Sequence, residues 1–197
     1  MGIDNRIRAV FLDRDGVINR SVVRDGKPYP PASLDALEIL PGVPQALKRL
    51  HDAGFRLIVV TNQPDVAMGT QTQTVVDDIH AHMAATLPLD EIRVCFHEDK
   101  DGCACRKPKA GMLLDAARDA GIQLTASFMV GDRWRDIDAG RIAGCRTVFI
   151  DYGYDERRPH QPDATVRSLA EAADWILDQG RASSAPTSGY SAPPRGL

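Results

Sequence analysis

The stretch Ala9-Val10-Phe11-Leu12-Asp13-Arg14-Asp15-Gly16 decides the fold. Its apolar first half is typical of a buried strand that ends at a polar turn. Similar short apolar runs cover residues 57–60, 92–96, 128–130 and 147–150. Segments with helical spacing separate these runs, so we expect an α/β fold, a three-layer, doubly wound parallel sheet. Functional side chains in such folds gather at the carboxyl ends of the strands.

Start and stop signals support the helices between these strands. The pair Pro41-Gly42 precedes an apolar stripe, and Ser168 with Glu171 forms a capping-box pair. Two other segments end at Gly121 and Gly144. The expected buried faces comprise Val43, Ala46, Leu47 and Leu50; Val75, Ile79, His82 and Met83; Leu113, Ala116, Ala117 and Ala120; Ala139, Ile142 and Ala143; and Leu169, Ala172, Ala173, Ile176 and Leu177.

The composition is that of an ordinary globular protein, with 197 residues and 24 Lys and Arg against 27 Asp and Glu, a net charge of -3. This balance argues against a nucleic-acid-coating role. No apolar run approaches the roughly 18 residues of a membrane span, and residues 1–8 carry charges where a secretory signal needs an apolar run. We therefore expect a cytoplasmic monomer without nucleic-acid or membrane partners. One domain over residues 1–179 should precede a disordered tail over residues 180–197, which is rich in Ser, Pro, Gly and Ala.

Two carboxylates follow the first strand. In an extended backbone, Asp13 and Asp15 project to the same side. One carboxylate can then attack phosphorus, while the other protonates the leaving oxygen. The alternative is an ordinary Asp-Gly turn.

Polar residues also follow two other strands. Thr61, with Asn62 and Gln63 behind it, can hold phosphate oxygens, although a plain polar turn is the alternative. Asp132 can share a hard divalent cation with Asp13, although it can also cap the next helix, as can Asp136.

Three of the four cysteines lie within eleven residues, in the pattern Cys95-x-His97-x5-Cys103-x-Cys105. Three thiolates and one imidazole make the closed tetrahedral set of a structural zinc site. The alternative is a pair of buried free cysteines beside an exposed histidine. Cys145 stands apart, next to a helix end, and is expected in the core.

A basic segment, Arg106-Lys107-Pro108-Lys109, follows the last of these cysteines. A loop ordered by zinc would hold its cations in place, and such cations fit phosphate. Taken alone, the segment is equally typical of a solvated basic loop.

In chain order, Asp13-Arg14-Asp15-Gly16, Thr61-Asn62-Gln63, Arg106-Lys107-Pro108 and Gly131-Asp132-Arg133 resemble the four motifs of haloacid dehalogenase (HAD) superfamily phosphatases, from about residue 10 to residue 150. Within that superfamily, the cysteine pattern and the Cys-Arg-Lys-Pro junction are similar to the heptose 1,7-bisphosphate 7-phosphatases and their relatives, the histidinol-phosphate phosphatases. The stretches between the motifs are too short for a separate cap domain, so loops alone should cover the site.

The resemblance implies a role for each matching position. Asp13 would be the nucleophile and a magnesium ligand, and Asp15 would be the general acid and base and offer its backbone carbonyl to the metal. Thr61 and Lys107 would stabilise the phosphoryl group, and Asp132 would complete the magnesium shell. The expected substrate contacts are Arg14, Asn62, Gln63, Arg106 and Arg133, with Ser21 and Arg24 in a flap. The expected ligands of structural zinc are Cys95, His97, Cys103 and Cys105.

The resemblance favours a sugar bisphosphate, most of all heptose 1,7-bisphosphate, as the substrate. Pro64-Asp65 and Met68 depart from the heptose enzymes near the sugar, so histidinol phosphate or another small sugar phosphate stays an alternative. Two readings without turnover are a phospho-acceptor receiver domain and a zinc-stabilised binding module. The receiver is disfavoured because Cys95 and His97, rather than an acidic nucleophile, stand at the end of the third strand.

Overall fold

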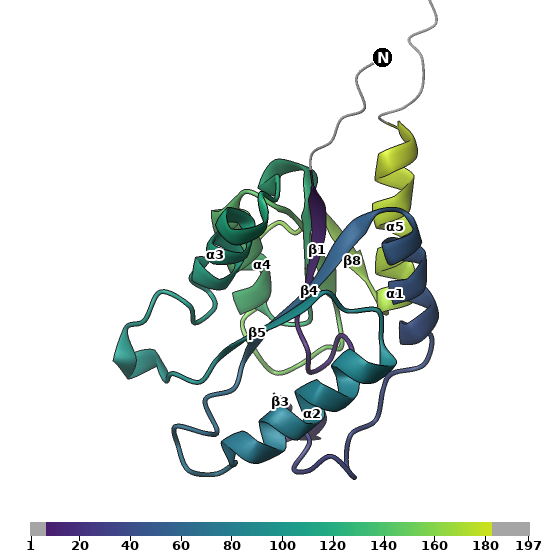
Figure 1. Ribbon diagram of the computed structural model, residues 1–197. Helices are drawn as coiled ribbons and strands as arrows, with labels where there is room; N and C mark the ends of the chain where they lie inside the picture. The colour runs from purple at the N-terminus through teal and green to yellow at the C-terminus, as the bar shows by residue number, and fades with distance from the viewer. Residues whose placement is uncertain (1–6, 183–197) are drawn as a thin grey trace, which may run out of the picture.

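The computed structural model describes residues 7–182. Its main sheet has six parallel strands in the order β5-β4-β1-β6-β7-β8 (Figure 1). The strands, in that spatial order, are β5 (Glu91–Cys95), β4 (Phe55–Asn62), β1 (Arg8–Leu12), β6 (Phe128–Gly131), β7 (Arg146–Ile150) and β8 (Ala164–Val166). Because β1 lies between β4 and β6, the residues that follow it are flanked by the ends of both neighbours.

Helices cover both faces of this sheet, as predicted (Figure 1). One apolar core lies between the sheet and α1 (Val43–Asp52), α2 (Gln73–Thr86) and α5 (Leu169–Ala182). The other lies between the opposite face and α3 (Gly111–Ala120) and α4 (Trp134–Ala143). Successive β1 residues from Ala9 to Leu12 alternate between the two cores, which is why this part of the strand is apolar. The three-layer architecture is therefore confirmed.

Two of the expected helix faces need correction. Ile142 is 62% exposed, because α4 packs through Gly140, where a Cβ would lie 2.5 Å from the Cβ of Met129. This close approach fixes the inward face of α4 and turns Ile142 to solvent. On α2, Val76 is buried with Ile79 and Met83, whereas His82 is exposed.

Three strands were not expected from the sequence. The short hairpin of β2 (Val22–Arg24) and β3 (Lys27–Tyr29) stands apart from the main sheet. The third strand, β8, forms one edge of the main sheet. Each has only three residues, too few to show a periodic pattern. The hairpin occupies the stretch between Asp15 and α1, where the flap was expected, and no second domain interrupts the part of the chain that the structure describes.

The carboxyl-terminal boundary also differs slightly from the prediction. Helix α5 continues to Ala182, beyond the expected end of the domain at residue 179. The rest of the predicted tail, residues 183–197, lies outside the described residues. None of the described helices is long and apolar enough to cross a membrane.

Candidate active site

Two buried aspartates follow neighbouring strands. The N–H of Asp13, directly after β1, donates to the carbonyl of Val130 in β6 at 3.0 Å, and Asp132 directly follows β6. Both carboxylate oxygens of Asp132 are buried, the Tyr154 hydroxyl lies beside them, and Asp132 forms no ion pair among the described residues. Gly16 permits this packing, because its φ is +86° and a Cβ there would lie 1.8 Å from Asp132 Oδ2. The expected meeting of Asp13 and Asp132 is therefore found.

Lys107 supplies a buried cation to these carboxylates. Its Nζ lies 2.9 Å from Asp13 Oδ1 and 2.6 Å from Asp136 Oδ1. Burial alone would lower the pKa of Lys107, but the charges of Asp13 and Asp136 outweigh it and raise the pKa. One ammonium thus contacts two carboxylates, and buried Asp132 adds a third negative charge nearby, so an excess of negative charge remains.

That excess is visible in the proton affinities. Burial, followed by the charge of Asp136, raises the pKa of Asp13 to about 6. Burial, followed by the charges of Asp13 and Asp136, raises the pKa of Asp132 well above its usual range. Asp132 therefore requires a positive partner to stay ionised at neutral pH, and such a partner would also lower the pKa of Asp13.

We call Asp13, Asp132 and Asp136 the carboxylate cluster, because one oxygen from each lies within 4.8 Å of the others. Asp136 is already engaged, since its Oδ1 pairs with Lys107 and its Oδ2 accepts the Arg133 N–H at 3.0 Å. It thus caps α4, as the sequence suggested, and also holds the lysine. Asp132 has no ion-pair partner among the described residues, and Asp13 is held at Oδ1 by Lys107 and by the Arg14 N–H. Together these two carboxylates can bind a hard divalent cation.

Asp15 lies beside this cluster and lines the same cleft. Its carboxylate accepts from Asn19 Nδ2 at 2.9 Å and from Gln63 Nε2 at 2.8 Å, and it forms an ion pair with Arg14. Gln63 Nε2 also donates to Thr61 Oγ1 at 2.9 Å. Gln63 and Asn19 therefore tether the side chains expected to do the chemistry.

Three of the expected substrate contacts make internal contacts instead. Arg14 is fully buried, lies outside the cleft and pairs with Asp15, so its position contradicts a contact with substrate. Gln63, also buried, does not line the cleft either. Asn62 does line it, but its Nδ2 donates to the Lys107 carbonyl and its Oδ1 accepts the Lys107 N–H, at 3.0 and 3.1 Å. Asn62 therefore anchors the backbone of the lysine.

The cleft itself has a volume of about 230 Å³, with Asp13, Thr61 and Lys107 among its lining residues. Arg106 and Arg133 line it as predicted. Arg106 Nε donates to Asp99 Oδ1 at 2.8 Å, and Arg133 pairs with Glu156. The cleft is therefore acidic around Asp13 and rich in cations farther out.

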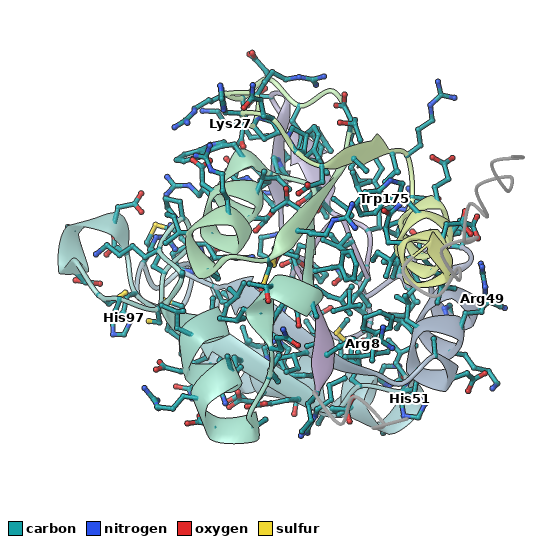
Figure 2. All side chains as sticks on the ribbon, turned by 90° about the horizontal axis from the view of Figure 1, so that it is seen from above. Arg8, Lys27, Arg49, His51, His97 and Trp175 are labelled. Atoms are coloured by element: carbon teal, nitrogen blue, oxygen red, sulfur yellow. The ribbon has the colours of Figure 1, made fainter. Side chains whose placement is uncertain are left out.

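Sequence reasoning missed four polar residues that line the cleft: Lys27, Tyr29, Arg135 and Glu156. Side chains with nitrogen tips gather at the edge of the molecule where Lys27 is labelled (Figure 2). Arg135 pairs with Asp99 at 3.2 Å, so the two arginines 106 and 135 share one carboxylate. No local pattern marks these residues, although Lys27 and Tyr29 fall in the segment predicted as a flap.

The two flap residues predicted to contact substrate lie in different places. Arg24 lines a 300 Å³ hollow that shares Tyr29, Asp65 and Met68 with the cleft. Ser21 is buried and lines a separate cavity with Tyr152 and Tyr154, so its position does not support a substrate contact within the cleft.

The four residues of the cysteine motif also meet, and we call them the Cys/His cluster. The sulfur of Cys105 lies 3.1 Å from that of Cys95 and 3.4 Å from that of Cys103, and His97 Nδ1 lies 3.3 Å from Cys105 Sγ. Sulfur atoms lie beside His97 on the side of the molecule away from Arg49 and Trp175 (Figure 2). The cluster can hold a metal ion. Cys145 is buried in the core between the sheet and the α3 and α4 layer, as expected.

Comparisons with known proteins agree with this geometry. Residues 104–172 match the family described as HAD-hydrolase-like. A heptose-1,7-bisphosphate 7-phosphatase of Thermosynechococcus vestitus is 34% identical, over 85% of this chain and 94% of that protein. The chain belongs to the heptose bisphosphate phosphatase family of HAD-like hydrolases.

Two further members of this family extend the comparison. The D-glycero-beta-D-manno-heptose-1,7-bisphosphate 7-phosphatase of Escherichia coli K12 is 36% identical, over 87% of this chain and 89% of that protein. The crystal structure of a heptose bisphosphate phosphatase from B. bronchiseptica, complexed with magnesium and phosphate, superposes with a TM-score of 0.72. It is 32% identical and covers 88% of this chain and 99% of that one.

Proposed function

We propose that this chain is a magnesium-dependent phosphomonoester hydrolase that removes the 7-phosphate of D-glycero-D-manno-heptose 1,7-bisphosphate through an aspartyl-phosphate. One observation carries the proposal. Asp13 and Asp132 are buried together beside Lys107 and Thr61, and Asp132 has no ion-pair partner among the described residues. Such a site requires a cation and presents a carboxylate to an anionic substrate.

In the first half-reaction, the Asp13 carboxylate attacks phosphorus, the bond from phosphorus to the sugar oxygen breaks, and Asp15 gives that oxygen a proton. Water then attacks the aspartyl-phosphate, Asp15 takes a proton from it, and phosphate leaves with Asp13 restored. Lys107 and Thr61 stabilise the charge on the phosphoryl oxygens. Bound by Asp13 and Asp132, magnesium would offset the repulsion between nucleophile and phosphate.

The substrate assignment rests on the relatives and on the cations of the cleft. The relatives described above are heptose-1,7-bisphosphate 7-phosphatases. Lys27, Arg106, Arg133 and Arg135 also line the cleft, and their charges would suit the second phosphate of a bisphosphate. Asp65, whose charge would repel that phosphate, is within 3.2 Å of the Thr70 hydroxyl, which donates to it.

We propose that the Cys/His cluster binds structural zinc. A tetrahedron with arms of about 2.3 Å has edges of about 3.8 Å, and the sulfur pairs lie 3.1 to 3.7 Å apart. Four protein ligands leave no open position for water, so this metal would organise the loop rather than take part in hydrolysis. Thiols available for metal are typical of a reducing compartment, which supports a cytoplasmic location, and we propose a monomer that binds no nucleic acid.

The function is tested by measuring phosphate release from both anomers of heptose 1,7-bisphosphate and from histidinol phosphate. We expect one phosphate per heptose bisphosphate, loss of turnover with EDTA, and recovery when zinc and magnesium are both restored. Asp13→Asn should abolish turnover while the protein stays folded.

Each other outcome has its own meaning. Comparably poor rates on all three compounds would reject the substrate assignment. A stable phosphoprotein without turnover would favour the receiver domain, and bound zinc without hydrolysis of any ester in a broad panel would favour the binding module.

A further inference from the structure

The buried guanidinium of Arg14 donates hydrogen bonds to both oxygens of the Asp15 carboxylate. Its Nε lies 3.2 Å from both oxygens of Asp15, and its Nη2 lies 3.1 and 2.9 Å from them. The Arg14 side chain is only 1% exposed, whereas that of Asp15 is 17% exposed and faces the cleft. Arg14 therefore holds Asp15 from behind, on the side away from substrate.

A histidine on α2 holds the remaining end of the same guanidinium. His80 Nε2 lies 3.1 Å from Arg14 Nη1. Because arginine has only donors, this contact requires an unprotonated Nε2 and places the ring proton on Nδ1. Burial, followed by the charge of Arg14, lowers the pKa of His80 to about 4, so the ring is a neutral acceptor at neutral pH.

We propose that His80 is a positioning residue that fixes the acid–base group Asp15 through Arg14. The proposal rests on the proposed function, because it gives Asp15 the proton transfers of that reaction. With Nη1 held by His80, the edge formed by Nε and Nη2 meets the carboxylate in one orientation. Gln63 and Asn19 complete the tether from the other sides. Helix α2 thereby fixes the orientation of the Asp15 carboxylate, which lies just after β1.

The contact is absent from the active-site motifs because its two partners are 66 residues apart. His80 does not line the cleft, so its removal leaves the substrate contacts in place. This separation allows a test that isolates proton donation to the leaving group. A sugar alkoxide needs a proton to leave, whereas a nitrophenolate hardly does.

The experiment compares kcat/KM for heptose 1,7-bisphosphate with kcat/KM for p-nitrophenyl phosphate. This constant reports the steps up to departure of the leaving group, so the shared hydrolysis of the aspartyl-phosphate drops out. We expect His80→Leu to lower kcat/KM about tenfold for the sugar ester, a fraction of the 100-fold or more that a general acid contributes. The loss for the nitrophenyl ester should be less than about twofold, because that leaving group depends little on the acid.

Two matched variants complete the design. His80→Gln keeps an acceptor and should recover most of the sugar-ester rate. His82→Leu, on the exposed side of the same helix, should leave both rates unchanged. Equal losses on the two esters, or no loss on either, would show that His80 does not act through Asp15. Unfolding temperatures of all variants show whether any has lost its fold.

Failure of the proposed function is recognised separately. If wild-type protein does not hydrolyse the heptose ester but hydrolyses another alkyl phosphate, that ester takes its place in the comparison. If it hydrolyses no ester, nitrogen NMR of the His80 ring decides the structural part. A neutral ring protonated at Nδ1 from pH 5 to pH 8 supports the contact, and a ring that gains a proton near pH 6.5 overturns it.

Discussion

The carboxylate cluster and the Cys/His cluster are both candidate metal sites, but they are built differently. Asp13 and Asp132 follow central strands, and all three members of the carboxylate cluster are buried. In the Cys/His cluster only Cys95 ends a strand, and the other members lie on the loop after it, with His97 exposed. Two members of the carboxylate cluster pair with a protein cation, Lys107, whereas the Cys/His ligands contact one another.

The carboxylate cluster and the Cys/His cluster therefore differ in how far each depends on a metal for its shape. The carboxylate cluster is held by the sheet, by the cap of α4 and by Lys107, so it should keep its geometry without magnesium. The Cys/His cluster requires deprotonated thiols, yet burial raises the pKa of Cys95. Without a metal its ligands have little reason to converge, so the loop should depend on zinc for its order. Because Lys107 follows Cys105 by two residues, order in the Cys/His cluster also helps to position Lys107 beside the carboxylate cluster.

The largest effect should come from removing the cation that pairs with the carboxylate cluster. Lys107→Met should lower kcat about 1,000-fold, as expected for the loss of one preorganised charge at the phosphoryl group. It should also lower the free energy of unfolding by about 3 kcal/mol, because buried Asp13 and Asp136 lose their partner. Phosphate-release kinetics and urea unfolding measure both. Lys109→Met is the matched control, because the Lys109 ammonium contacts the carbonyls of residues 102 and 103. A similar loss of activity in that variant would contradict a special role for Lys107.

The next largest effect tests the dependence of the loop on zinc. Cys103→Ser should remove bound zinc and shift Lys107, and a shift of about 1 Å would lower kcat about 100-fold. Zinc content, unfolding temperature and kcat should fall together. Cys145→Ala changes a cysteine outside the cluster and should keep its zinc. Protein purified without chelator that contains no zinc would falsify the site.

Magnesium binding at the carboxylate cluster should change how the stability of the folded protein depends on pH. Because the folded pKa of Asp13 is raised to about 6, the metal-free protein should lose stability as pH rises from about 4 through 6. Magnesium at about 100 times its Kd should restore about 2.7 kcal/mol at pH 7.5, or roughly 5–10 °C. The gain should shrink at pH 5, where protons compete with the metal.

Thermal unfolding with and without magnesium at the two pH values measures this effect. Asp132→Asn, which removes one expected ligand charge, should abolish most of the gain at pH 7.5. An equal gain from magnesium at both pH values would show that the ion binds elsewhere.

The smallest effect concerns the ion pair that connects the cleft to the loop. Asp99, in the loop between His97 and Cys103, binds both Arg106 and Arg135. Arg135→Gln should raise KM for a bisphosphate about fivefold, worth about 1 kcal/mol for a partly exposed charge, with little change in kcat. Arg118→Gln, on α3 and away from the cleft, should leave KM unchanged. A fall in kcat without a rise in KM would place Arg135 among the residues that order the site.

Much of the fold follows from local pattern. The central strands β1, β4, β6 and β7 contain apolar runs because both of their faces are covered, and a run of that kind can be recognised in the sequence. The three-residue strands β2, β3 and β8 were missed because their pairing depends on neighbours distant in the chain. Ile142 was misplaced because the close packing of Gly140 against Met129 decides the face of α4.

The sequence by itself determined which groups are available and in what order. Asp13, Asp132 and Lys107, and the four residues of the Cys/His cluster, could be selected because their chemistry and their places next to strands are local properties. Only the tertiary structure decided that Arg14 turns inward to Asp15 and His80, that Asp136 joins Lys107, and that Lys27 and Arg135 reach the cleft. A side chain pairs with the groups that lie near it. Which distant segments lie near each other depends on tertiary packing, and no local pattern records it.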